Sequence, residues 1–127
     1  MDVTRFLESN FDAGLGELDG KDSVIIYFGT FAGLDEIHRL DTRLYEEIPL
    51  AIGRHDGHEV AIDDTHGTLF SYGENAETLF KAMQPILNEF DFLEGATVQL
   101  CFINNREKPL DLEFKLERTN NLIKDNE

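Results

Sequence analysis

Histidine and carboxylate side chains gather between residues 55 and 66, which include three of the four histidines of the chain. The group consists of His55, Asp56, His58, Glu59, Asp63, Asp64 and His66. Imidazole nitrogens and carboxylate oxygens are ligands for zinc and similar metals, and a β-hairpin can bring its two ends together. His55, His58 and His66 are therefore the candidate metal ligands, although their spacing matches no closed zinc motif.

Strand geometry argues against convergence of these ligands. The residues from 57 to 72 alternate as two strands around a turn. In a regular strand His58 shares a face with Val60, whereas Glu59 and Asp63 lie on the other face. We therefore interpret the hairpin as mainly solvated, and we expect no metal and no other cofactor.

No signature of nucleophilic or phosphate chemistry is present. Cys101 lies between apolar neighbours on a predicted strand, which is typical of a buried, inert thiol. Ser71 lacks the Gly-x-Ser-x-Gly context of a nucleophile elbow, and the glycines show neither Walker nor dinucleotide spacing. Acid pairs such as Asp63-Asp64 would need a dry cleft to separate their pKa values. We predict no catalytic residues and a protein that is not an enzyme.

The elements that must position these residues follow from the hydrophobic pattern. An apolar run over 23–30 predicts a central strand, and apolar positions at helical spacing from Leu34 predict a helix that ends near Glu47, before Pro49. The other predicted elements are an N-terminal helix over 2–15, hairpin strands over 57–62 and 68–72, a helix from Ala76 to Phe90 that is capped by Asn75 and bent near Pro85, and strands over 97–103 and 110–116.

The order of these elements predicts an α+β fold. Its centre, βαββαβ, is the order of a ferredoxin-like split βαβ sandwich, which has a mainly antiparallel sheet and its helices on one face. We expect a single domain over 1–127. It would comprise an N-terminal helix or arm over 1–22, a βαββαββ core over 23–117 that includes an extra C-terminal edge strand, and a frayed tail over 118–127.

Composition limits the partners. Of 127 residues, 26 are acidic and 11 are Lys or Arg, and the net charge of −15 repels nucleic acids and anionic membranes. The 41% of hydrophobic residues and the ten Phe argue against disorder. A single cysteine, no apolar run of about 20 residues and no basic start before an apolar segment predict a cytoplasmic protein.

Several short runs resemble a pattern found in small bacterial proteins that lack an assigned function. They are Asp56–Val60, Gly67–Gly73, Ala76-Glu77, Leu79-Phe80, Pro85–Leu87 and Gly95–Val98. These residues are structural, so the resemblance implies a bacterial α+β domain and no catalytic residues. By size and charge alone, the chain also resembles the immunity proteins of bacterial toxin systems.

Three functions remain open. The first is an acidic, non-enzymatic protein-binding module, most concretely an immunity-type inhibitor that blocks a cationic toxin such as a nuclease. Its predicted partner contacts are Tyr45, Glu46, Glu47, Asp56, Glu59, Asp63, Asp64 and Tyr72. The second is a housekeeping domain that forms a homodimer through its open sheet face or an edge strand. The third is a metal-dependent or small-molecule-binding protein that uses the His-rich hairpin. Simple solubility is the competing explanation of the charge.

Overall fold

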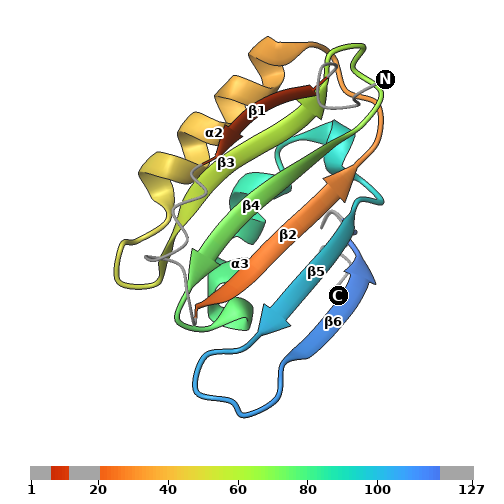
Figure 1. The fold of residues 1–127 in the computed structure, drawn as a ribbon. Helices are drawn as coiled ribbons and strands as arrows, with labels where there is room; N and C mark the ends of the chain where they lie inside the picture. The colour runs from red at the N-terminus through yellow and green to blue at the C-terminus, as the bar shows by residue number, and fades with distance from the viewer. Residues whose placement is uncertain (1–6, 12–20, 118–127) are drawn as a thin grey trace, which may run out of the picture.

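The computed structural model describes residues 7–11 and 21–117, which form an α+β structure. Within these residues, six strands pair into one antiparallel sheet, and two α-helices pack on one face of it (Figure 1). The elements in chain order are β1 (Leu7–Phe11), β2 (Asp22–Phe28), α2 (Leu34–Glu47), β3 (Gly53–Ala61), β4 (Gly67–Gly73), α3 (Ala76–Leu87), the short 3-10 helix η2 (Asp91–Leu93), β5 (Thr97–Phe102) and β6 (Leu110–Lys115).

The strand order in the sheet is β1-β3-β4-β2-β5-β6, and every neighbouring pair is antiparallel. The apolar strand β2 therefore lies between β4 and β5, and β1 and β6 form the two edges. Ile26 of β2 lies opposite Leu69 of β4 and Val98 of β5. These three buried side chains share the face that the helices cover.

The two helices each bury an apolar stripe against this face. The stripes consist of Ile37, Leu40 and Leu44 in α2, and of Leu79, Met83, Ile86 and Leu87 in α3. Burial of a side chain of this size contributes about 1.5–3 kcal/mol, so these contacts hold the helices on the sheet. In the described part of the chain, neither helix is both long and apolar enough to cross a bilayer.

The helix boundaries follow local chemistry. α2 spans the predicted residues 34–47. The side chain of Asn75 accepts a hydrogen bond from the backbone N–H of Thr78 at 2.9 Å, which confirms the predicted cap of α3. Pro85 lies inside α3 as predicted. The helix ends at Leu87 and not at Phe90, because the chain continues there with tighter bonds from residue i to residue i−3.

The predicted N-terminal helix over 2–15 is wrong where the structure describes this segment. Residues 7–11 are strand β1, which pairs with β3 so that Leu7 lies opposite Ala61 and Phe11 lies opposite Gly57. The spacing of four between Leu7 and Phe11 fits a helix, but a helix this short is unstable by itself, whereas the edge of β3 offers a full set of backbone partners. The remainder of the predicted helix and arm, and the tail over 118–127, lie outside the described residues.

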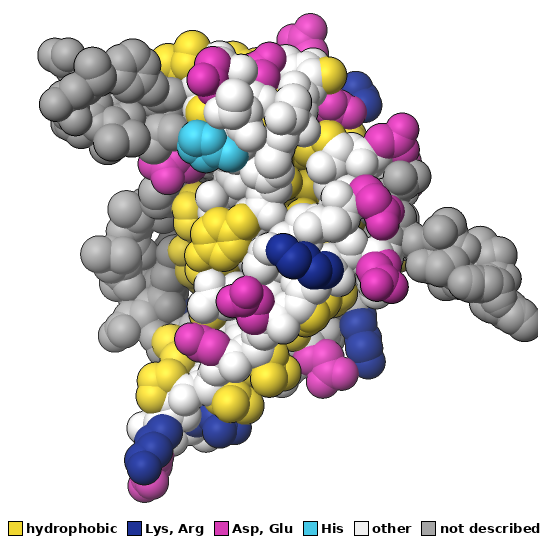
Figure 2. Space-filling model, turned by 90° about the vertical axis from the view of Figure 1, so that its right-hand side faces the viewer, with side chains coloured by type: hydrophobic (Ala, Val, Ile, Leu, Met, Phe, Trp, Pro, Cys, Tyr) yellow, Lys and Arg dark blue, Asp and Glu magenta, His cyan; other side chains and the backbone are white. Residues whose placement is uncertain are grey.

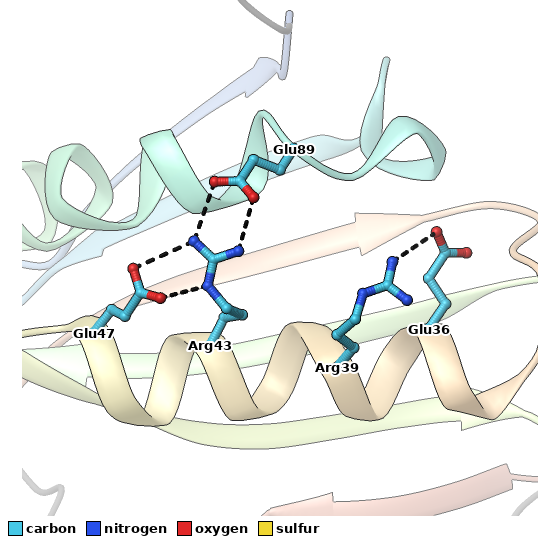
Figure 3. A network of polar contacts seen from close by, with 5 residues as sticks. All are labelled: Glu36, Arg39, Arg43, Glu47 and Glu89. Carbon is cyan, nitrogen blue, oxygen red and sulfur yellow. Dashed lines mark hydrogen bonds and ion pairs between the residues drawn. The ribbon is translucent and has the colours of Figure 1, made fainter.

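Arg43 joins the two helices on their outer side (Figure 3). Its guanidinium donates to both carboxylate oxygens of Glu89, which follows α3, at 2.8 and 3.1 Å, and it also donates to Glu47 of α2. The hydrogen bonds to Glu89 and Glu47 raise the pKa of Arg43. Because these side chains are 31–56% exposed, water and salt screen the contacts, which contribute little to the stability of the fold.

Candidate functional site

Four polar side chains are buried together between α2 and the sheet, and we name them the histidine cluster. Asp41 belongs to α2, His55 and His58 belong to β3, and Ser71 belongs to β4. The four residues are at most 3% exposed. The prediction that the histidines of the hairpin are solvated is therefore wrong for His55 and His58.

Hydrogen bonds link the histidine cluster into one chain of groups. Asp41 Oδ1 lies 2.6 Å from His55 Nε2, and Asp41 Oδ2 contacts His58 Nδ1. The second ring nitrogen of His55, Nδ1, lies 2.9 Å from the Ser71 hydroxyl oxygen. An ionised carboxylate can only accept, so each histidine donates an N–H to Asp41. A neutral His55 then accepts the hydroxyl proton of Ser71.

A β-bulge places both histidines on the same face of β3. Their separation of three residues would put them on opposite faces of a regular strand. The register between β3 and β4 shifts between His55 and Gly57, so that Asp56 is the extra residue of the bulge. Gly57 adopts a φ of 133°, a conformation that favours glycine. His55 and His58 consequently both face α2.

Asp41 lies within the buried stripe of α2, four residues after Ile37 and three before Leu44. An ionised carboxylate in such a place is unfavourable unless it is paired. Burial alone would raise the pKa of Asp41, but hydrogen bonds from His55 and His58 outweigh burial and hold the pKa below its usual value. A carboxylate inside an apolar helix stripe is the signal in the sequence that could have pointed to this cluster.

Aromatic rings of α2 flank the histidine cluster. The Tyr45 ring packs edge-to-face against His55 with a centroid distance of 5.0 Å, and the His38 ring lies 5.6 Å from the His58 ring. The Tyr45 hydroxyl donates to the backbone oxygen of Asp56 at 3.3 Å, and burial raises the pKa of Tyr45. Tyr45, a predicted partner contact, is thus exposed on one side and covers the cluster with the other.

The order Ser71, His55, Asp41 matches the order of nucleophile, base and acid in a hydrolytic triad. The cluster differs from such a triad in one respect: Ser71 is fully buried, so a substrate cannot reach its hydroxyl. A pocket of about 360 Å³ lies beside the start of β3 and the end of β4, and its lining contains no member of the histidine cluster. Cys101 is half-buried and not fully buried as predicted, and this burial raises the pKa of its thiol. Since a nucleophile must reach its substrate, the cluster fits a polar network inside the core.

The three candidate metal ligands are not brought together. His55 and His58 point into the core, whereas His66 is exposed in the loop after β3, with Nδ1 3.1 Å from the hydroxyl of Thr65. Among residues 21–117, no group of three or more His, Cys, Asp and Glu side chains is arranged to hold a metal ion.

Comparison of the chain with protein-family models, curated proteins and solved structures found no match. The resemblances to small bacterial proteins and to immunity proteins therefore stay predictions.

Four of the predicted partner contacts are divided between two ends of the molecule. Glu46 and Glu47 end α2, close to the start of β3, whereas Asp63 and Asp64 follow the other end of β3. The nine residues of β3 span about 30 Å at roughly 3.3 Å per residue. These two acid pairs therefore do not form one contact surface.

Three other predicted contacts lie on the strands of the sheet. Asp56 is buried in the bulge, and its carboxylate lies 3.4 Å from the guanidinium of Arg54. Glu59 and Tyr72 are half-buried on the face that the helices leave open. Burial raises the pKa of Tyr72. Of these three, only Glu59 and Tyr72 present part of their surface to solvent.

Three connections meet at one end of the sheet, and we name their surface the acidic end. They are residues 29–36, which include the first residues of α2, residues 62–67, which end at the first residue of β4, and residues 91–96 between α3 and β5. The backbone N–H of Phe31 donates to the backbone oxygen of Asp64 at 3.1 Å, and the centroids of the Phe31 and Phe92 rings lie 6.4 Å apart. The connections contain no Lys or Arg and carry the carboxylates Asp35, Glu36, Asp63, Asp64, Asp91 and Glu94. Of these, Glu36 lies 4.0 Å from the guanidinium of Arg39 in α2 (Figure 3).

Apolar and ionised groups are mixed at the acidic end. Leu34 is 38% exposed and Ile62 is 62% exposed. The hydroxyl of Thr65 donates to Asp63 at 2.6 Å, which lowers the pKa of Asp63 and keeps its carboxylate charged. Carboxylates and exposed aliphatic side chains therefore share one surface at this end.

Proposed function

We propose that this protein is a non-enzymatic, acidic binding module that engages a basic protein partner, as an immunity-type inhibitor engages a cationic bacterial toxin such as a nuclease. The observation that carries the proposal is the acidic end, with its six carboxylates, no Lys or Arg, and the exposed Leu34 and Ile62 among them. Opposite charges speed and orient association, and the aliphatic side chains add contact area once water is expelled. The net charge of −15 attracts the same kind of partner.

We further propose that β2 to β5 form a ferredoxin-like split βαβ sandwich to which β1 and β6 are added at the edges. The order β3-β4-β2-β5, with antiparallel pairing throughout and both helices on one face, supports this description. The helices and strands of such a core hold both ends of each connection at the acidic end. A partner would therefore meet a surface that is already ordered.

The decisive experiment compares two triple variants with equal loss of charge. The first, Asp35→Asn, Asp63→Asn and Asp64→Asn, removes three of the six carboxylate charges of the acidic end. The control, Glu46→Gln, Glu77→Gln and Glu107→Gln, neutralises three exposed acids at the opposite end of the sheet. Asp35 and Glu77 both lie in the first turn of a helix, so the two variants disturb helix dipoles alike.

We expect the wild type and the control to retain a basic protein from an extract of the native host, to release it at high salt, and to protect cells that produce it. The acidic-end variant should bind it at least about tenfold more weakly, since several opposed charges are lost at once. Equal binding by both variants would refute the assignment to the acidic end. Absence of any salt-sensitive basic partner would refute the function.

A further inference from the structure

Strand β6 exposes more apolar surface than its sequence predicts. Its alternation suggests one buried and one solvated face, yet all six of its residues are exposed. Leu110, Leu112 and Phe114 keep 40%, 47% and 38% of their surface in solvent. Phe80 of α3 touches Phe114 at a ring distance of 5.3 Å, but the helix layer does not cover this row. Figure 2 looks onto this side of the molecule and shows hydrophobic side chains gathered among charged ones.

The outer edge of β6 also presents backbone hydrogen-bonding groups. Leu116 exchanges hydrogen bonds with residues 95 and 96, on the β5 side. Because the direction of these groups alternates along a strand, Leu112 and Phe114 also bond toward β5, whereas Asp111, Glu113 and Lys115 direct their N–H and C=O groups away from it. No described strand pairs with this side of β6.

We propose that the edge of β6 binds a second copy of this chain, strand against antiparallel strand, with Glu113 of the two copies on the symmetry axis. In this register Asp111 lies opposite Lys115 of the partner subunit, and Lys115 lies opposite Asp111 of the partner subunit. On the other face, Leu112 lies opposite Phe114 of the partner subunit, twice by symmetry. Two ion pairs and two aliphatic–aromatic pairs thus form across the axis, and the two sheets become one.

Charge selects this register over its closest competitor. Two symmetric registers pair five residues of β6. The other one places Leu112 on the axis and sets Asp111 opposite Glu113 of the partner subunit, twice, so that it contains two like-charge pairs and no ion pair. Like charges directly opposite each other destabilise a strand pair. The axis therefore falls at Glu113, where a single like-charge pair remains.

Within one copy, Lys115 donates to the Thr97 hydroxyl at 2.7 Å, and it has to turn outward to reach the partner. That contact is exposed and exchanges readily with water. The interface residues belong to β6, whereas Leu34, Ile62 and the loop carboxylates of the acidic end belong to other segments, although Lys115 lies next to residues 95 and 96 of that end. The pairing of β6 with a second copy does not depend on the proposed function.

A charge exchange tests the register in the full-length protein. Asp111→Lys alone and Lys115→Asp alone each convert both ion pairs into like-charge pairs, and we expect each to weaken the dimer about tenfold in sedimentation equilibrium. An equimolar mixture of the two variants restores both ion pairs and should form a heterodimer. Glu113→Gln removes the repulsion on the axis and should strengthen the dimer by about threefold.

Amide hydrogen exchange identifies what covers the edge. The N–H groups of Asp111, Glu113 and Lys115 should become protected as protein concentration rises. Protection that is already complete in a monomer would show that the chain covers its own edge, and would overturn the proposal. A wild type that stays monomeric with unprotected amides, or a dimer that the charge variants leave unchanged, would overturn it as well. The melting temperature of each variant at low concentration controls for folding.

Discussion

Asp41 stays ionised inside the core because two histidines donate hydrogen bonds to it. Its pKa is lower in the folded chain than in the unfolded chain, so the folded state binds fewer protons near pH 4. The resulting stabilisation is complete above the unfolded pKa of about 3.9 and is lost as the pH falls through the lower folded value.

This linkage predicts a specific acid response. Asp41→Asn should lower the free energy of unfolding near neutral pH and should flatten its decline below about pH 4. Urea denaturation at a series of pH values measures both effects. Asp35→Asn, an exposed change on the same helix, is the control and should leave the decline as steep as in the wild type. An equally steep decline in Asp41→Asn would show that other carboxylates carry the acid response.

Asp22 is a second buried carboxylate, and it accepts hydrogen bonds from backbone N–H groups. It accepts hydrogen bonds from the N–H groups of Ala76 at 2.9 Å and of Ile103 and Asn104, both at 2.8 Å. Asp22 thereby ties the start of α3 to the end of β5. Asp22→Ala should cost about 2–4 kcal/mol, because three backbone donors lose their partner. Chemical denaturation measures the loss, and exposed Glu46→Ala should change stability by less than about 0.5 kcal/mol.

At the scale of the element, the bulge in β3 decides where the hairpin side chains go. Gly57 holds a φ of 133° that an alanine adopts only with strain. Gly57→Ala should destabilise the protein by about 1–3 kcal/mol and should loosen the contact of His55 and His58 with Asp41. The histidine ring signals in NMR spectra report the second effect. Gly29→Ala is the matched control, since a Cβ there meets no atom within 4 Å.

At the scale of the whole molecule, charge opposes folding. A net charge of −15 on 127 residues makes the folded chain repel itself, and salt screens that repulsion. The melting temperature should therefore rise by a few degrees between low salt and about 0.5 M NaCl. Thermal unfolding followed by circular dichroism measures the shift. A falling melting temperature would mean that ion pairs such as Arg43 with Glu89 outweigh the general repulsion.

The local parts of the fold were predictable because their signals are local. The apolar spacing of α2 and the cap at Asn75 depend on neighbouring residues, and the structure confirms both. The acidic loop at Asp63 and Asp64 is evident in the same way. That this loop lies beside the connections before α2 and before β5 could not be predicted from the sequence, because the strand order brings those distant segments together.

By itself, the sequence determined the helix stripes and the alternation of the strands, which repeat with the period of the backbone, and the excess of negative charge, which follows from composition. The tertiary structure alone decided that residues 7–11 form a strand, that a one-residue bulge turns His55 and His58 inward onto Asp41, and that β6 lies beyond the helix layer. Each of these outcomes depends on which distant segment supplies the neighbour. A period in the sequence reports which residues share a face, but the strand order decides what covers that face.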